Sequence, residues 1–417
     1  MRFQKDKIPG KNYLVFKKWG RKSYSLFSIL HKAVKISVLS VSYFLAVPVL
    51  SFAMETDTTK QVKMEFNLEE IEVSASRAPS VYSEIARVLT VITAKEIEQG
   101  PATSLQDLLE QVTSIDVRQR GAGGIQADIS IRGGTFDQTL ILLNGINITD
   151  PQTGHHNLNI PVSLSQIERI EVLKGPAARI YGPNAFSGAI NIVTKQNSGN
   201  ELSALISAGS YRYLNSNISA GFVTGKMNHL VAGNYKSSNG YINSTDFGAS
   251  NLFYSGKLDS EKGKLSLQTG FTDKGFGANS FYTPVYPNQY ENTQTLFSSV
   301  KFESYAKLNL TPVIYFRRHS DKFMLFRENP PEWYQNHNFH RTDIWGANLN
   351  SWFLWHAGKT SFGTEFRSEK ILSNVLGEEM ESFIRVPGEN AFFTKSKTRN
   401  IVSLFAEHIF YFNRWTI

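Results

Sequence analysis

From about residue 201 to residue 417, apolar and polar side chains alternate in short segments separated by Gly, Asn, Asp and Ser. Alternation with a period of two predicts β-strands that have one apolar and one polar face. Many segments end on Phe, Tyr or Trp, as do strands that cross a bilayer with aromatic side chains at its interfaces. Ten segments fit the pattern: residues 202–208, 214–222, 229–236, 252–258, 265–271, 295–302, 308–316, 344–353, 360–366 and 401–410.

Long and short connections alternate between these predicted strands. Turn-rich stretches occupy residues 273–294, 321–340 and 372–400, and the other turns are much shorter. Outer-membrane barrels have this asymmetry because one end carries long loops and the other end tight turns. A soluble β-sandwich or a propeller would also show alternation, but no fixed repeat period supports a propeller. The pattern therefore favours a membrane β-barrel.

Residues 78–197 have the pattern of a compact α+β unit. Thr93 and Glu96 have the spacing of a capping box at the start of a helix. Residues 103–112 place their Leu and Val side chains on one face of a second helix. Asn144-Gly145 favours a tight hairpin turn. Strands are predicted at residues 88–93, 115–118, 129–132, 140–143, 169–173 and 189–194.

The excess of positive charge lies at the N-terminus. Residues 1–35 contain ten Lys and Arg and one acidic residue, Asp6, which gives +9. The whole chain carries +8, so the rest carries −1 and gives no support for nucleic-acid binding. An apolar run at residues 36–50 and Ser51-Phe52-Ala53 then indicate a secretory signal peptide over residues 1–53. A single membrane-anchoring helix is the alternative for this run.

Composition excludes several other classes of protein. The 417 residues include no Cys, so a disulfide framework, a thiolate metal site and a Cys nucleophile are excluded. The mean hydropathy of −0.25 excludes a protein of many membrane-spanning helices. It is compatible with a barrel, because barrel strands average apolar and polar faces.

Residues 54–77 are predicted to be a flexible segment with one short strand. Apolar and polar residues alternate through Glu70, Ile71, Glu72, Val73, Ser74 and Ala75. Such a strand can pair with the sheet edge of a partner protein. From these residues alone, an ordinary first strand of the next domain fits equally well.

Five short motifs of residues 68–195 together resemble a known family. They are residues 129–133 (ISIRG), 142–146 (LLNGI), 167–176 (IERIEVLKGP), 181–182 (YG) and 185–194 (AFSGAINIVT). In this order and spacing they resemble the plug domain of TonB-dependent outer-membrane receptors. The family usually has Asp-Gly where this chain has Asn144-Gly145, and either dipeptide suits a tight turn.

The resemblance implies an α+β plug, residues 78–197, followed by the first part of a transmembrane barrel, residues 198–417. About ten strands are predicted where the family has about 22, so we expect an incomplete barrel and a truncated chain that cannot transport alone. The resemblance also implies a TonB box at Glu70–Ala75, a non-enzymatic function without cofactor, and a location in the Gram-negative outer membrane. The implied partners are the TonB protein, membrane lipid and a scarce solute such as a siderophore or cobalamin. A surface-binding or signal-transducing protein on the same fold is the alternative.

Two groups of plug residues are assigned roles. Arg132, Glu168, Arg169 and Glu171 are expected to pair against a polar lumen, and Gly133, Gly145, Gly175, Gly182 and Gly188 to allow sharp turns or close packing.

The resemblance places residues 149–157 at the outer apex, where Asp150, Gln152, His155, His156 and Asn157 are candidate solute contacts. Consecutive His side chains of an extended chain point to opposite faces, so the sequence predicts no metal site formed by the pair. No spacing indicates catalysis.

Overall fold

The structure is a computed structural model that describes residues 72–73, 80–81, 89–175, 181, 183–196, 199–412 and 415–416. The predicted signal peptide, the predicted box residues Glu70, Ile71, Ser74 and Ala75, and Gly182 lie outside these residues. Leu68–Ile417 forms one compact unit. Within it we call residues 89–196 the plug region and strands β10–β21 the large sheet.

The plug region is a small mixed sheet with short helices. Its five-stranded sheet has the order β3-β8-β9-β6-β7, in which β6 and β9 are parallel and the other pairs antiparallel. A separate hairpin pairs β4 with β5, and β1 pairs with β2 ahead of the plug region. The elements are β1 (Glu72–Val73), β2 (Ser80–Val81), β3 (Leu89–Thr93), α2 (Ala94–Gln99), α3 (Leu105–Glu110), β4 (Ile115–Gln119), η2 (Ala122–Gly124), β5 (Ala127–Ile131), η3 (Phe136–Gln138), β6 (Thr139–Leu143), β7 (Ile146–Asn147), η4 (Gly154–His156), η5 (Leu164–Gln166), β8 (Ile167–Lys174), η6 (Pro183–Ala185) and β9 (Gly188–Thr194).

Local signals in the sequence account for the ends of several plug elements. The Thr93 hydroxyl accepts from the Glu96 N–H and the Glu96 carboxylate accepts from the Thr93 N–H at 2.7 Å, which is the predicted capping box. Asn144 and Gly145 have φ of 52° and 81°, and Leu143 pairs with Ile146 across them. Positive φ at both positions defines a tight hairpin turn whose twist suits antiparallel strands.

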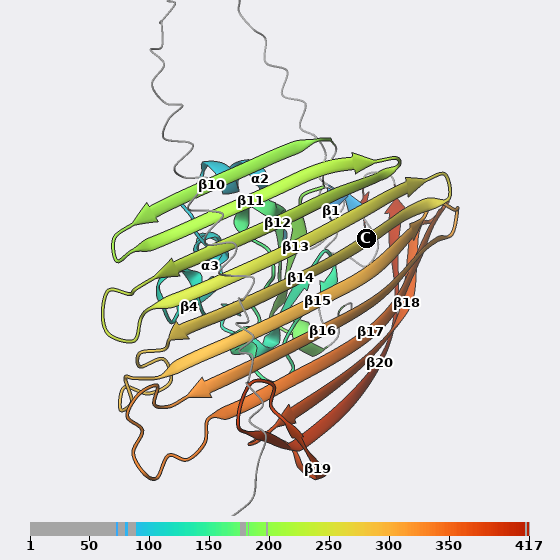
Figure 1. Cartoon of the computed structure of the whole chain (residues 1–417). Helices are drawn as coiled ribbons and strands as arrows, with labels where there is room; N and C mark the ends of the chain where they lie inside the picture. Colours follow the sequence, from blue (N-terminus) through green and yellow to red (C-terminus); the bar gives the residue numbers. More distant parts are fainter. Residues whose placement is uncertain are drawn as a thin grey trace, which may run out of the picture. The chain divides into compact units, whose positions relative to one another are not determined.

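The large sheet is antiparallel and has twelve strands, in the order β10-β11-β12-β13-β14-β15-β16-β17-β18-β20-β19 with β21 paired to β20. Figure 1 shows β10 to β18 side by side in chain order. Their bounds are β10 (Glu201–Gly209), β11 (Tyr213–Thr224), β12 (Met227–Ser238), β13 (Phe247–Ser260), β14 (Gly263–Gly277), β15 (Tyr290–Ser304), β16 (Asn309–Met324), β17 (Asn338–Trp355), β18 (Gly358–Ser373), β19 (Glu378–Arg385), β20 (Phe392–Phe412) and β21 (Trp415–Thr416).

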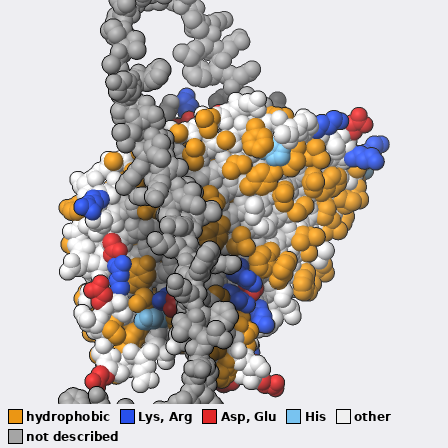
Figure 2. All heavy atoms as spheres, viewed as in Figure 1, with side chains coloured by type: hydrophobic (Ala, Val, Ile, Leu, Met, Phe, Trp, Pro, Cys, Tyr) orange, Lys and Arg blue, Asp and Glu red, His pale blue; other side chains and the backbone are white. Residues whose placement is uncertain are grey.

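One face of the large sheet is apolar and exposed, as the alternation predicts. A row of side chains, each more than a third exposed, crosses adjacent strands on this outer face: Leu267, Val300, Ile314, Phe366 and Val402. Figure 2 shows hydrophobic side chains gathered over this side of the molecule. An exposed apolar surface of this extent marks contact with lipid or with another protein. No helix in the described part of the chain is long and apolar enough to cross a membrane.

The opposite, inner face packs on the plug region. One buried cluster contains Ile141 and Ile190 of the plug sheet together with Phe297, Tyr315 and Ile344 of the large sheet. The two parts therefore share a hydrophobic core, and the polar side chains beside this core are held at fixed places between them.

The strands are longer, and the loops shorter, than the sequence predicts. The strand β16 has 16 residues and β20 has 21, against predicted segments of roughly ten. The strand β19 lies within residues 372–400, which the sequence predicted as turns. A strand can extend beyond its apolar segment because the hydrogen bonds between strands are made by the backbone and not by the side chains. Beyond the apolar band the outer face also becomes polar, so the alternation that reveals a strand is lost from the sequence.

Candidate functional site between the plug region and the large sheet

The site begins with the loop after β7, which holds the predicted solute contacts. The Asp150 N–H donates to Asn157 Oδ1 at 2.9 Å, and Asp150 Oδ1 accepts from the Gln152 N–H at 2.9 Å. The Thr153 side chain accepts from the His155 N–H and begins the short 3₁₀ turn η4. These bonds fold the loop onto itself, so its side chains have fixed directions.

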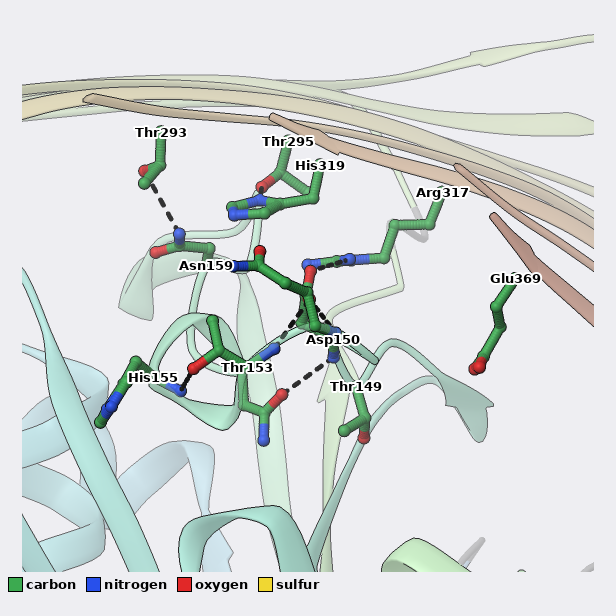
Figure 3. Close-up of polar contacts among 12 residues, drawn as sticks. Thr149, Asp150, Thr153, His155, Asn159, Thr293, Thr295, Arg317, His319 and Glu369 are labelled. Carbon is green, nitrogen blue, oxygen red and sulfur yellow. Dashed lines mark hydrogen bonds and ion pairs between the residues drawn. The ribbon is translucent and has the colours of Figure 1, made fainter. Parts of the chain in front are cut away.

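Asp150 forms a buried ion pair with the wall. Arg317 of β16 donates from Nη1 to Asp150 Oδ2 at 2.7 Å, and both side chains are almost completely buried. Figure 3 shows the arginine reaching from the sheet to the loop. Burial alone would raise the pKa of Asp150, but the adjacent Arg317 charge holds it well below its usual value. The carboxylate is therefore ionised and fully paired.

A second arginine from the wall binds the backbone of the same loop. Arg367 of β18 donates to the carbonyl oxygens of Asn147 and Thr149 at 3.0 Å each. Its Nε donates to Glu369 Oε1 at 2.6 Å, so the guanidinium is paired on the wall side as well. The planar guanidinium binds in several directions at once, which a lysine could not do. The loop is thus fixed to the wall by two arginines.

The two consecutive histidines diverge. His155 Nδ1 lies 2.5 Å from Asp128 Oδ1, and Arg120 contacts the same carboxylate at 2.6 Å. In Figure 3 the His155 ring points away from the other labelled side chains. His156 Nε2 lies 3.1 Å from Glu291 Oε1 of β15. Burial alone would lower the pKa of His156, but nearby Glu291 raises it above the usual value. The chain is a 3₁₀ turn here, not the extended segment that the sequence argument assumed.

The predicted plug residues occupy tight turns and internal pairs. Gly133, Gly145 and Gly175 have φ of 77°, 81° and 108°, a region that favours glycine. A Cβ on Gly188 would lie 2.5 Å from the Leu173 carbonyl oxygen, so this position requires close backbone approach.

Three of the four predicted charged residues of the plug pair with one another. Arg169 contacts Glu168 at 2.6 Å and buried Glu171 at 2.9 Å, and both pairs are internal to the plug region. Arg132 is a non-glycine residue with φ of 51°, and its Nη1 would lie 3.2 Å from a Cβ on Gly175. Of the predicted TonB box, Glu72 and Val73 form β1 and pair with Val81 and Ser80.

The residues that the wall contributes are not among those predicted from the sequence. Inner-face positions of β15, β16 and β18 carry charged or titratable side chains: Glu291, Arg317, His319, Asp321, Arg367 and Glu369. A signal was present, because residues 313–321 (VIYFRRHSD) alternate and the titratable positions 317, 319 and 321 share one face. Such charges facing inward from a strand indicate a polar lumen.

A cavity with both apolar and polar lining residues lies elsewhere between the plug region and the large sheet. It has a volume of about 480 Å³ and lies between the plug region and strands β10 to β14, with asparagines of the sheet among its lining residues: Asn215, Asn217, Asn234 and Asn251. This is the size of a pocket for a small ligand.

Comparison with known proteins identifies the class of this fold. Residues 81–189 match the family TonB-dependent Receptor Plug Domain. Vitamin B12 transporter BtuB of Vibrio vulnificus is 36% identical over 174 residues, which are 41% of this chain and 28% of that protein. BtuB of Vibrio cholerae serotype O1 is 33% identical over 177 residues, 42% of this chain and 28% of that protein.

Solved structures share the fold over about four fifths of this chain. The copper transporter OprC aligns with a TM-score of 0.62 and 15% identity, over 79% of this chain and 53% of that chain. A variant of the ferric enterobactin receptor PfeA from Pseudomonas aeruginosa aligns with a TM-score of 0.59 and 18% identity, over 82% of this chain and 57% of that chain. This chain therefore spans about half of the structures that it resembles.

The fold is a plug-like unit packed against an antiparallel, barrel-like sheet. More specifically, the chain carries the plug domain of a TonB-dependent receptor followed by a partial barrel-like sheet, which confirms the predicted fold class. Receptors of this family are non-enzymatic transporters of the Gram-negative outer membrane.

Proposed function

We propose that this chain is the plug and part of the barrel wall of an importer that takes up a scarce solute across the outer membrane, driven by TonB. Cobalamin or a ferric siderophore is the proposed class of cargo. The observation that carries the proposal is the plug-like position of the loop after β7, which is tied to the wall through Asp150–Arg317 and Arg367. The identity to vitamin B12 transporters over the plug supports the cobalamin class.

The Asp150–Arg317 ion pair and the hydrogen bonds of Arg367 explain why such an importer needs external energy. Buried, fully paired charges separate only at a large cost when the partners move apart. The outer membrane holds no useful potential, whereas the inner membrane supplies about 2.3 kcal/mol per charge per 100 mV. A protein that spans the periplasm can carry this energy to the plug as a mechanical pull.

Tension on the N-terminal segment would act directly on the first strand of the plug region. We assign Glu70–Ala75 as the TonB box, where main-chain pairing with a partner strand gives the grip. The next strand of the plug region is β3, which lies at an edge of the five-stranded sheet and pairs with β8. An edge strand has one ladder to break, so tension from the box would release β3 before any other strand of this sheet.

The test measures uptake of labelled cobalamin and a labelled ferric siderophore by a receptor-deletion strain that carries the gene for the whole importer of which this chain is a part. We expect one of the two solutes to accumulate, and Val73→Pro to abolish accumulation while binding to cells is unchanged. Proline removes a main-chain donor and restricts the preceding residue, so it disturbs strand pairing. Val73→Thr keeps the N–H and the branched side chain and is the matched control.

Three results would count against the proposal. Normal uptake by Val73→Pro refutes the assigned box, and accumulation of neither solute refutes the proposed cargo class. Surface binding without accumulation favours the alternative, a surface-binding protein on the same fold.

A further inference from the structure

A cluster of buried donor atoms lies beside the Asp150–Arg317 pair and takes no part in it. It consists of His156 from η4 of the plug region and His319 and Asp321 from the inner face of β16. One donor atom from each residue lies within 4.8 Å of the others. The three residues are 4%, 0% and 6% exposed, so water cannot serve them freely.

Two atoms of this cluster are buried without a hydrogen-bond partner. His319 Nδ1 bonds the Thr295 hydroxyl at 2.8 Å, which leaves its Nε2 unpartnered. Oδ1 of Asp321 is likewise unpartnered. A buried acceptor without a partner is costly, and native structures rarely keep one without a reason. Two such atoms in one cluster indicate a ligand that satisfies both.

A second carboxylate borders the same space. Glu291 of β15 contacts His156 Nε2 at 3.1 Å, and its other oxygen accepts from the Tyr282 hydroxyl at 2.9 Å. Asp321 and Glu291 thus bring two carboxyl groups to one buried cluster, which also contains His156 and His319. A divalent cation would balance this charge.

We propose that His156, His319 and Asp321 bind a divalent transition-metal ion of the zinc class, with Glu291 as the fourth ligand. Three points separated by at most 4.8 Å fit within a circle of radius about 2.8 Å, so side-chain shifts of roughly 0.7 Å reach the 2.0–2.1 Å of zinc–nitrogen bonds. Imidazole and carboxylate ligands suit zinc. Thr295 fixes the His319 ring with Nε2 free, and Tyr282 orients Glu291, as outer partners of metal ligands do.

The proposed ion joins two parts of the receptor. One ligand comes from the plug loop, and the other three come from the wall strands β15 and β16. Four protein ligands leave no open coordination position, which is typical of a structural site. The ion is therefore a clamp between plug and wall and not the imported cargo.

The test measures metal binding by the whole importer that contains this chain, isolated from cell envelopes with its barrel assembled as the cells assemble it. The protein is stripped with a chelator and equilibrated with Zn²⁺ alone, and bound metal is measured by mass spectrometry. We expect about one ion per chain in the parent, as for one closed zinc site. His319→Gln and Asp321→Asn should each weaken binding by about tenfold or more, because each removes a ligand.

His408→Gln is a closely matched control. His408 on β20 also bonds a threonine hydroxyl through Nδ1, to Thr360 at 2.8 Å, and its Nε2 is also buried without a partner. It lies outside the cluster, so His408→Gln should bind zinc as the parent does. Equal binding by the parent and all three variants overturns the proposal.

A measurement on the parent alone decides the matter if the ligand variants fail to fold. Co²⁺ in place of zinc should give the intense visible absorption of a four-coordinate site, and chelator should remove it. An absent spectrum, or no zinc in the parent, overturns the site. Neither measurement uses uptake, so failure here is distinct from failure of the proposed import function.

Discussion

Arg317 and Arg318 are consecutive residues of β16 in opposite environments. Arg317 points inward to Asp150 and is 2% exposed, whereas Arg318 points outward, pairs with Asp343 and is 44% exposed. Their chemistry is the same, so they form a natural comparison of buried and exposed ion pairs. The alternation of the strand alone decides which arginine holds the plug.

We predict that Arg317→Gln destabilises the plug and that Arg318→Gln does not. Removing one partner of a buried pair costs about 3–5 kcal/mol, because the other charge stays buried without compensation. An exposed pair contributes less than about 1 kcal/mol. Hydrogen exchange of plug peptides measures the free energy of opening for both variants. Equal exchange in the two variants would contradict the role assigned to Arg317.

The loss in Arg317→Gln should not depend on pH near neutrality. The pKa of Asp150 is lowered in the folded state, so its stabilising contribution is present above its unfolded pKa of about 3.9. The contribution is lost only as pH falls below that value toward the folded pKa. Titration of Asp150 should therefore leave the difference unchanged between about pH 6 and 8, after correction for the intrinsic exchange rate, and His156, whose pKa is raised partly by Asp150, is the nearby group that can change it. A marked decrease of the difference within this window would mean that another group titrates with the pair.

The sequence predicted which residues of the loop after β7 are candidate contacts, but it did not predict which residues they bind. The sequence singled out Asp150, His155 and His156 as polar groups of a functional loop. Their partners in the chain lie at separations that local patterns cannot reveal: Arg317 is 167 residues from Asp150. The conclusion that the histidines diverge agrees with the structure, but its reason differs. The expectation considered the two histidines as an isolated pair, whereas each histidine contacts a carboxylate elsewhere in the fold.

At the scale of elements, local chemistry predicted the plug better than the wall. Capping boxes and the Asn144-Gly145 turn are set by contacts within a few residues, so the sequence contains the whole signal. The lengths of β16 and β20 depend on pairing with neighbouring strands, which continues where the outer face becomes polar. The strand β19 was missed for the same reason, since it pairs with β20 through a shifted register.

The edge strand β3 gives a prediction about movement of the plug. Thr90 and Val172 are register partners of β3 and β8, and antiparallel partners lie within the Cα separation that a disulfide needs. The double variant Thr90→Cys/Val172→Cys should therefore lock β3 to the sheet when oxidised. If β3 must be released for import, uptake should fall to the level of cells without receptor and return after reduction. The 417 residues contain no Cys, so no other thiol of this chain competes with the introduced pair.

A matched cross-link belongs in the wall. Val223 and Asn228 are register partners of β11 and β12 beside a short turn. Oxidation of Val223→Cys/Asn228→Cys should leave uptake unchanged, because neighbouring wall strands have no need to separate. Full uptake by the oxidised β3–β8 variant would show that the plug moves without releasing β3.

At the scale of the molecule, the described sheet is open. Among the described residues β10 pairs with β11 alone, and the other end of the ordered sheet is β19. Each open edge is a row of backbone donors and acceptors without partners in the sheet. A bilayer does not tolerate such edges, so sheets that span it close into barrels. The structures that align with this chain extend well beyond the aligned part, since the alignment covers only 53% of OprC and 57% of PfeA.

We therefore predict how the 417-residue polypeptide behaves when it is produced by itself. Its twelve-stranded sheet has an apolar outer face for lipid, but the two open edges would need about ten further strands to reach the 22 of a plugged barrel. Barrels that have closed resist detergent and migrate faster on gels before heating than after. The polypeptide alone should show no such shift and should be degraded or found in aggregates, because its edges pair with other chains instead. A stable monomer in outer-membrane fractions that changes mobility on heating would show that these strands close by themselves. In that case the plug would fill a smaller barrel, and the Asp150–Arg317 contact would be the first to reassess.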